Sequence, residues 1–153
     1  MKIRKATTND LVKIQELNNK LFELELANYD KDLKPNWPFS SAGKSYFEDL
    51  ILNNIVYVAE HNGDVIGYIA GRVNEEESYA LKRFTELENM YVEDFAQGNG
   101  VGTLLIDEFK KECENKKAAS IKVTASYTNE KAISFYKKHL FNNKDLTLLC
   151  ELN

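Results

Sequence analysis

The chain is poor in cysteine, proline and histidine, with two of each among its 153 residues. Two cysteines provide no disulfide framework. Cys113 and Cys150 fall in apolar periodic positions, so we expect both to be buried free thiols. The spacing of histidine, cysteine and acidic residues fits no metal site, so we expect no metal. His61 falls in a predicted turn and His139 at a predicted helix end, and neither is expected to be functional.

Long apolar runs and an excess of basic charge are also missing. No apolar run reaches the ~18 residues that suggest a membrane-spanning helix, and the N-terminus has no apolar signal-peptide core, so we expect a cytoplasmic protein. The net charge is −4, from 20 basic and 24 acidic residues. A nucleic-acid binder usually carries a basic face. We therefore expect neither nucleic acid nor a membrane as a partner.

Hydrophobic periodicity predicts one domain over residues 1–153, built from strands and helices. The order is strand, two helices, three strands, helix, strand, helix and strand. Asn62-Gly63 predicts a hairpin turn between the second and third strands. The expected strands cover residues 2–6, 55–60, 65–73, 80–92, 120–126 and 146–152, and the expected helices cover residues 11–26, 42–53, 101–116 and 129–138.

The stretch Gln97-Gly98-Asn99-Gly100-Val101-Gly102 places three glycines at the start of a predicted helix. Glycine disfavours a helix by up to ~1 kcal/mol per residue, so this start needs a reason. A helix N-terminus has unpaired N–H groups and a partial positive charge, and a missing Cβ lets a ligand approach them. A strand, a glycine turn and a helix are typical of a phosphate site. Thr103 adds a hydroxyl inside the first turn.

Two common phosphate motifs do not fit this turn. No Gly-Lys-Ser/Thr follows, which excludes a Walker motif, and the third glycine of G-x-G-x-x-G is replaced by Thr103 or Leu105, depending on the starting glycine. The strand after the helix ends at Thr124-Ala125-Ser126, without the acidic residue that binds a ribose. The glycines alone therefore fit a structural loop about as well as a phosphate site.

The wider sequence resembles the GCN5-related N-acetyltransferase (GNAT) family in two motifs. The first family signature is Gln/Arg-x-x-Gly-x-Gly/Ala after a strand with an aliphatic end, and here it is Gln97 to Gly102, five residues after Val92. The second signature is an Asn, an Ala and a Phe-Tyr pair on the next helix. These correspond to Asn129, Ala132, Phe135 and Tyr136.

The resemblance covers nearly the whole chain, because the order of the elements also looks like the GNAT core. It implies an α/β (α+β mixed) fold with a central mixed, mostly antiparallel sheet that is splayed at the cofactor site and flanked by helices. One position departs from the family pattern. Leu140 stands where a glycine often follows Phe-Tyr. This difference concerns how the helix ends and not the chemistry.

The resemblance also implies acetyl-coenzyme A (acetyl-CoA) as co-substrate. Backbone N–H groups from Gly98 to Thr103 would hold its pyrophosphate, the Val92 main chain would bind its pantetheine arm, and the Met90 amide would bind the thioester carbonyl. Asn129 fits both a helix N-cap and a cofactor contact. The expected cofactor-binding residues are Met90, Val92, Gln97, Gly98, Asn99, Gly100, Val101, Gly102, Thr103, Asn129 and Tyr136.

The implied function is that of an acyltransferase that moves an acetyl group directly to a primary amine. Only a neutral amine attacks a thioester, so a base must face the site. Alternation puts Glu86, Glu88 and Met90 on one face of their strand unless a bulge intervenes. The residues do not decide between Glu86 and Glu88, and we favour Glu88. Tyr136 matches the general acid of many members, although its apolar stripe also fits a core aromatic.

The acceptor is expected to be cationic, either a small molecule or a peptide. In the family, the first two helices and the loops beside them shape the acceptor site. Here that region carries several acids and aromatics, namely Glu23, Glu25, Asp30, Asp32, Glu75 to Glu77, Tyr29, Trp37, Phe39 and Tyr46. Two alternatives stay open: a GNAT-fold module that binds acetyl-CoA without turnover, and another acyl donor such as succinyl-CoA. Members of the family are often homodimers, and a final strand from Thr147 to Leu152 could pair across such an interface.

Overall fold

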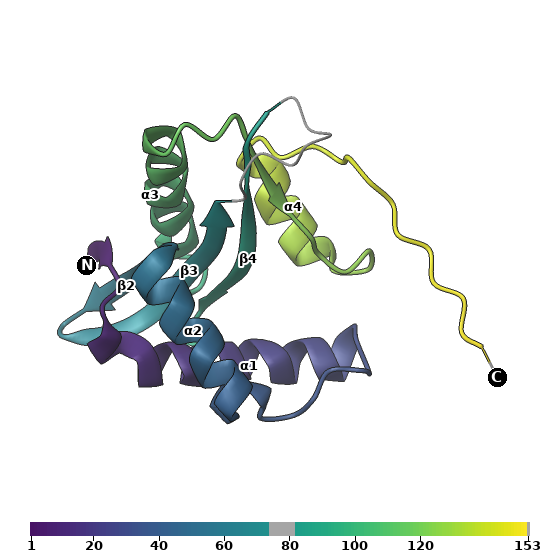
Figure 1. Ribbon diagram of the computed structural model, residues 1–153, viewed down its shortest axis with the longest axis horizontal. Coiled ribbons are helices and arrows are strands. Elements are labelled where there is room, and N and C mark those ends of the chain that lie inside the picture. The colour runs from purple at the N-terminus through teal and green to yellow at the C-terminus, as the bar shows by residue number, and fades with distance from the viewer. Residues whose placement is uncertain (74–81, 153) are drawn as a thin grey trace.

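The structure is a computed structural model that describes residues 1–73 and 82–152 (Figure 1). One five-stranded sheet has the order β1-β2-β3-β4-β5. Its strands are β1 (Lys2–Lys5), β2 (Ile55–His61), β3 (Asp64–Val73), β4 (Phe84–Val92) and β5 (Ser120–Val123). The pairs from β1 to β4 are antiparallel, and β4 and β5 are parallel. The predicted mixed, mostly antiparallel sheet is confirmed.

Helices cover both faces of the sheet (Figure 1). The α-helices among the described residues are α1 (Leu11–Asn28), α2 (Ser41–Asn53), α3 (Val101–Asn115) and α4 (Glu130–Lys138). Ile14 of α1 and Leu50 of α2 belong to one core cluster, whereas Leu105 and Phe109 of α3 belong to the other. Three short 3-10 helices, Thr8–Asp10, Trp37–Phe39 and Asp94–Ala96, join these elements. The helix pair and α3 therefore pack on opposite faces.

Local signals fix the hairpin and the start of α1. Asn62 and Gly63 have φ angles of 52° and 90°, the left-handed conformation that an Asn-Gly turn needs. Before α1, the Asp10 carboxylate accepts a hydrogen bond from the Thr7 N–H at 2.8 Å, in a capping box. Arg4 donates two further hydrogen bonds to Asp10, each of 2.8 Å. This ion pair ties β1 to the start of the first helix.

Helix α4 ends in a Schellman motif without a glycine. The Phe141 N–H donates to the Tyr136 carbonyl and the Leu140 N–H to the Lys137 carbonyl, both at 3.1 Å. Leu140 takes the left-handed conformation, with a φ of 68°. The missing glycine therefore does not change how the helix ends. It leaves a leucine in a conformation that costs L-residues roughly 1 kcal/mol.

The predicted final strand is wrong. Residues 142–152, which we call the C-terminal tail, have no secondary structure and extend away from the body (Figure 1). A strand-like sequence forms a strand only where another strand pairs with it, and the tail has no such neighbour. Cys150 lies in the tail and is exposed, so the expected burial is wrong for Cys150 and right for Cys113. Residues 80 and 81 of the predicted third long strand lie outside the described residues.

Candidate active site

The parallel strands β4 and β5 pair at one end and then separate. Their last pair is Leu87 with Val123, so β4 continues to Val92 without a partner on that side. Just beyond β4, the Glu93 N–H donates to the Ile66 carbonyl next to it on β3, at 2.9 Å. Main-chain groups alternate in direction along an antiparallel strand. The N–H and C=O groups of Val92 and Met90 are therefore directed toward the gap that β5 leaves.

A β-bulge lies where the two strands begin to separate. The pairing of β4 with β3 shifts register between Ala70 and Gly71, which leaves Glu88 as the extra residue on β4. A bulge bends its strand and increases the local twist. The bulge therefore explains why β4 turns away from β5 at this point and not elsewhere.

The bulge also changes which side chains share a face. Leu87 and Met90 both pack on the α3 side. Glu88 and Asn89 both bond to Tyr46 on the opposite side, against α1 and α2. The alternation that put Met90 on the same face as Glu86 and Glu88 is therefore wrong, because the extra residue reverses the order beyond it.

The glycine turn at the start of α3 meets two separate requirements. Gly98 and Gly100 have φ angles of 77° and 80°, and a Cβ on either would meet no atom within 4 Å. These two glycines give a left-handed turn beside open space. Gly102 instead allows close packing, because its Cβ would lie 3.2 Å from both Met90 Cε and the Phe135 ring. The turn thus leaves the first N–H groups of α3 accessible.

Gln97 connects three segments around this turn. Its Nε2 donates to the Val92 carbonyl at 2.8 Å and to the Asp94 carboxylate at 2.9 Å. Its Oε1 accepts from Lys131 Nζ of α4 at 2.6 Å. The Val92 carbonyl is thus already engaged, which leaves the Val92 N–H for a ligand. Nothing in the sequence marks Lys131, because it is one exposed helix lysine among many.

On the other side of the gap, α4 presents Asn129 and Tyr136. The Asn129 side chain accepts a hydrogen bond from the Ala132 N–H at 3.0 Å, so its predicted N-cap role is confirmed. Tyr136 packs against Phe135 and Phe141, with ring centroids 5.4 Å apart in each pair. Burial, with the charge of Glu25, raises the pKa of Tyr136 to about 12. The phenol therefore keeps its proton at neutral pH.

The Glu88 carboxylate is held on the α2 side of the sheet. Tyr46 Oη donates a hydrogen bond to Glu88 Oε2, and Arg72 Nε lies 3.1 Å from Glu88 Oε1. Arg72 also contacts Asp49 of α2, at 2.5 Å. Burial, followed by the bond to Glu88, raises the pKa of Tyr46. The Glu86 side chain makes no hydrogen bond or ion pair with the rest of the described chain.

The Glu88 cluster continues into the core through amide and phenol groups. Asn89 Nδ2 donates to Tyr46 Oη at 2.6 Å, and Asn18 Nδ2 donates to Asn89 Oδ1 at 3.1 Å and to Tyr68 Oη at 2.7 Å. Asn18 and Tyr68 are fully buried. The sequence does not predict this network. Asn89 is its one visible signal, because asparagine is uncommon inside strands.

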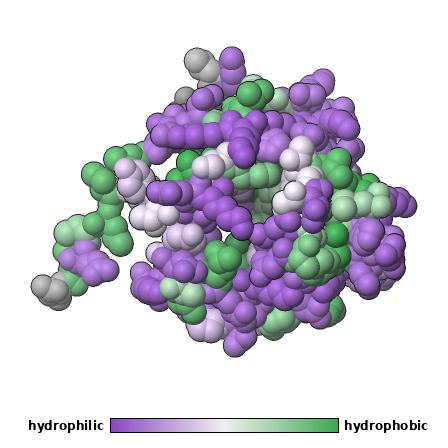
Figure 2. Space-filling model, turned by 180° about the vertical axis from the view of Figure 1, so that it is seen from behind, coloured by the Kyte–Doolittle hydropathy of each residue, from purple (hydrophilic) through white to green (hydrophobic). Residues whose placement is uncertain are grey.

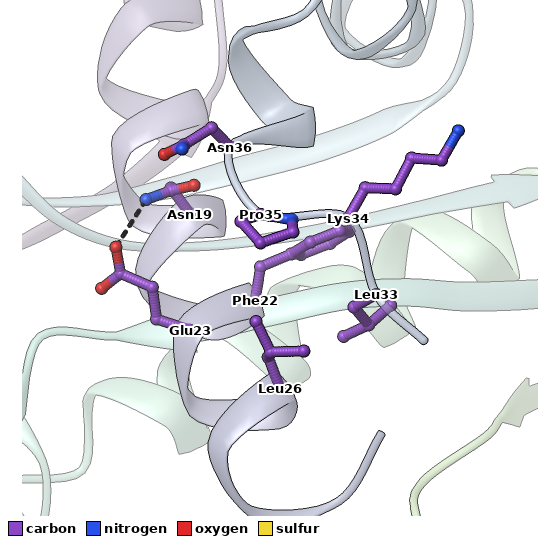
Figure 3. Close-up of a pocket in the computed structure, with 8 residues that line it drawn as sticks. All are labelled: Asn19, Phe22, Glu23, Leu26, Leu33, Lys34, Pro35 and Asn36. Carbon is purple, nitrogen blue, oxygen red and sulfur yellow. Dashed lines mark hydrogen bonds between the residues drawn. The ribbon is translucent and has the colours of Figure 1, made fainter. Parts of the chain in front are cut away.

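Two of the predicted acceptor-side aromatics cluster between α1 and α2. Trp37 stacks on Phe22, with centroids 5.6 Å apart, and meets the edge of Tyr46 at 5.4 Å. Phe39 is half exposed and lies outside these ring pairs. A small cavity of about 120 Å³ opens beside Phe22 (Figure 3). It is lined by Asn19, Phe22, Glu23, Leu26, Leu33, Lys34, Pro35 and Asn36.

The predicted acids of the acceptor side are only partly described. Asn19 Nδ2 donates to Glu23 Oε1 at 2.9 Å at the rim of this cavity (Figure 3). Burial raises the pKa of Glu25, with a smaller contribution from Asp30. Glu75 to Glu77 lie outside the described residues. Within the described chain, no three acidic, cysteine or histidine side chains form a metal-binding group, and no helix is long and apolar enough to span a membrane.

Known proteins resemble this chain in sequence and in fold. An uncharacterized N-acetyltransferase of Methanocaldococcus jannaschii is 25% identical over 145 residues, which are 94% of this chain and 62% of that relative's length. A Bacillus halodurans crystal structure superposes with a TM-score of 0.88 at 17% identity and covers 100% of both chains. An aminoglycoside N-acetyltransferase in complex with CoA has a TM-score of 0.74 at 14% identity, with 99% of each chain covered. At these identities, the two solved structures establish the fold alone.

The family comparison covers most of the chain. Residues 16–141 match the model of the acetyltransferase (GNAT) family, and this range includes the glycine turn, the bulge and α4. The chain therefore belongs to the acetyltransferase (GNAT) family, whose members use acetyl-CoA.

Proposed function

We propose that this chain transfers an acetyl group from acetyl-CoA directly to a primary amine of a cationic small molecule or peptide. One observation carries the proposal. The gap between β4 and β5 brings the main chain of Met90 and Val92, the open start of α3, and Tyr136 of α4 around one site. Family membership supports the same reaction class. Because the chain spans 62% of the length of its curated relative, the acceptor and the complete activity remain part of the proposal.

The residues at the gap fit acetyl-CoA. Gly98 and Gly100 leave open space where a pyrophosphate would meet the first N–H groups of α3. Asn99, Val101 and Thr103 complete this cradle in the proposal. The Val92 N–H would hold the pantetheine arm, and the Met90 N–H would donate to the carbonyl oxygen on which charge develops, a contribution of about 10²–10³ in rate. Bound there, acetyl-CoA supplies the reactive thioester.

In this proposal, Glu88 takes the proton of the amine, directly or through water. Its carboxylate lies on the side of the aromatic cluster, two residues before Met90, and Arg72 and Tyr46 hold it in a fixed position. Glu86 remains the alternative base. Tyr136 would donate a proton to the departing thiolate, which its pKa of about 12 allows because the phenol is protonated at neutral pH. Asn129 would contact the cofactor while it caps α4.

The acids near α1 support a cationic acceptor. Glu23 lies at the rim of the cavity between α1 and the loop that follows, and Glu25 lies one turn from Phe22 on the same helix. The half-buried carboxylate of Glu25 attracts an ammonium group more strongly than an exposed carboxylate does. In the proposal, the acceptor binds along this side of the molecule and presents its amine to Glu88.

Thermal unfolding in the presence of acetyl-CoA, NAD or ATP tests the first half of the proposal. A ligand at 100 times its Kd adds about 2.7 kcal/mol of stability, so the Tm should rise by several degrees with acetyl-CoA alone. The second half is tested by CoA thiol release with a panel of amines, using Cys150→Ser to remove the exposed protein thiol. A Tm shift without transfer to any amine would favour the non-catalytic alternative. The absence of a shift would contradict the proposal.

A further inference from the structure

One face of α4 lies against the glycine turn and the start of α3. Lys131 and Phe135 both contact this turn, and His139 follows four residues later, at the C-cap of the helix. Residues at four-residue spacing on a helix share a face. The His139 ring accordingly reaches α3, where its Nε2 lies 3.3 Å from Thr103 Oγ1. His139 therefore stands beside a hydroxyl of the proposed phosphate cradle.

The position of the His139 side chain is fixed by contacts on two sides. Its ring packs on the Phe135 ring, with centroids 4.6 Å apart. Its main-chain carbonyl accepts a hydrogen bond from Lys110 Nζ of α3 at 2.6 Å. The C-terminal tail that follows α4 extends away from the body (Figure 2), and the histidine is only partly buried. The imidazole is thus held beside Thr103 while it remains open to solvent.

The protonation of His139 decides where the Thr103 hydroxyl can send its single proton. When Nε2 carries no proton, it accepts the hydrogen bond from Thr103, and that proton is not available to a ligand. When Nε2 carries a proton, it donates to Thr103 Oγ1, and the hydroxyl is free to donate elsewhere. Both ring nitrogens of an imidazolium are donors, so the charged form always gives the second arrangement.

We propose that His139 is a positioning residue for the cofactor, whose protonated imidazole acts through Thr103 by turning the threonine hydroxyl toward the pyrophosphate of acetyl-CoA. This inference rests on the proposed function, which puts the pyrophosphate at the start of α3. It adds a residue that lies outside both family motifs. The imidazolium also brings a positive charge close to the phosphates, which strengthens a hydrogen bond to them.

The surroundings of His139 set the direction of the expected pH dependence. Burial lowers the pKa of His139 most, Lys110 lowers it further, and Asp107 acts in the opposite direction. The imidazole is therefore mainly neutral at pH 7 in the free protein. A bound pyrophosphate adds negative charge and raises the pKa of His139. Binding then takes up protons, so the affinity for the cofactor should rise as the pH falls.

Isothermal titration with 3′-dephospho-CoA at pH 6, 7 and 8 tests this role. This ligand keeps the pyrophosphate but lacks the 3′-phosphate, which itself titrates in this range. The wild type should bind about three- to tenfold more tightly at pH 6 than at pH 8. His139→Gln keeps an N–H donor that does not titrate, so its affinity should be the same at all three pH values. His61→Gln is the matched control at the other histidine and should keep the wild-type pH profile.

Two further measurements separate a positioning role from a structural one. Titration at pH 6.5 in two buffers of different ionisation enthalpy should show proton uptake by the wild type and none by His139→Gln. Thr103→Val removes the hydroxyl and should abolish most of the pH dependence although His139 is still present. A pH profile that either His139→Gln or Thr103→Val leaves unchanged would overturn the inference, while binding itself would leave the proposed function standing. If the wild type binds neither 3′-dephospho-CoA nor acetyl-CoA at any pH, the proposed function fails and this inference fails with it.

Discussion

Glu88 and Arg72 form an ion pair across the β-bulge, with 3.1 Å between Glu88 Oε1 and Arg72 Nε. Arg72 lies opposite Glu86 in the register of β3 and β4, yet its ion pair is with Glu88. Glu88 lies on the face that simple alternation from Leu87 gives it, and there it contacts both Tyr46 and Arg72. The two glutamates that the sequence left equivalent are therefore in different environments.

This difference predicts unequal effects of two isosteric substitutions. If Glu88 is the base, Glu88→Gln should lower kcat by about 10²-fold or more, since it keeps the shape and removes the proton acceptor. Glu86→Gln should change kcat by less than about threefold under the same reading. Steady-state kinetics with the best amine measures both, and the acetyl-CoA thermal shift of each variant should match the wild type. The reverse ranking would transfer the role of base to Glu86.

A matched pair of glycines tests the ligand at the glycine turn. Gly98 and Gly63 have φ angles of 77° and 90°, and a Cβ on either meets no atom within 4 Å. An alanine at either position should cost roughly 1 kcal/mol of stability through backbone strain. Only Gly98→Ala should weaken acetyl-CoA binding, which isothermal titration measures. Equal acetyl-CoA affinity in both variants would place the cofactor away from this turn.

Leu140→Gly is predicted to stabilise the protein. Leu140 holds a left-handed φ of 68°, and its side chain is 84% exposed, so glycine relieves strain and removes little packing. After allowing for the greater freedom of glycine in the unfolded chain, we expect a gain of about 0.5 kcal/mol in the free energy of unfolding. Chemical denaturation measures it. Lys138→Gly, within the helix, is the control and should lose about 1 kcal/mol.

Asp10 should make the free energy of unfolding depend on pH. Its hydrogen bonds to Arg4 are the main reason that the pKa of this carboxyl lies below its ordinary value. The ionised carboxylate therefore stabilises the folded state above pH ~4, and this contribution is lost as the pH falls through the lowered folded-state pKa. Asp10→Asn should cost about 2 kcal/mol at pH 7 and much less at pH 3.

Denaturant unfolding at pH 7, 5 and 3 checks the Asp10 prediction. Asp49→Asn is a useful comparison, because Asp49 also pairs with an arginine but is more exposed to solvent than Asp10. The Asp49 pKa is also lowered, by Asn53 first and then by Arg72, but its side chain is 43% exposed. Its substitution should therefore have the smaller effect on stability. A loss for Asp10→Asn that is the same at all three pH values would contradict the ionic explanation.

The two cysteines should differ in reactivity. Burial raises the pKa of Cys113 to about 11, so its thiolate is scarce at neutral pH and shielded from solvent. Cys150 is exposed in the C-terminal tail. In the folded protein, a thiol reagent at pH 8 should label Cys150 alone, and denaturation should expose the second thiol.

The order of the elements and the local turns could be predicted from the sequence. Hydrophobic periodicity placed each described α-helix within two residues of its observed start and end, and Asn62-Gly63 placed the hairpin, whereas the three short 3-10 helices were not predicted. The glycines before α3 marked the start of that helix, and Asn129 marked the N-cap of α4. These features depend on the conformational preferences of residues that are adjacent in the chain, and such preferences follow directly from the residue types.

The tertiary structure alone decided which side chains meet. The bulge at Glu88 depends on how β4 pairs with β3, and the contact of Gln97 with Lys131 depends on how α4 docks beside the glycine turn. The predicted strand in the C-terminal tail does not form for the same reason. The sequence has the alternating pattern of a strand, but a strand also needs a neighbouring strand to pair with. The sequence by itself determined the helices, the hairpin and the glycine turn through local propensity. Pairing and packing between distant segments decided which faces the side chains occupy and which ion pairs they form.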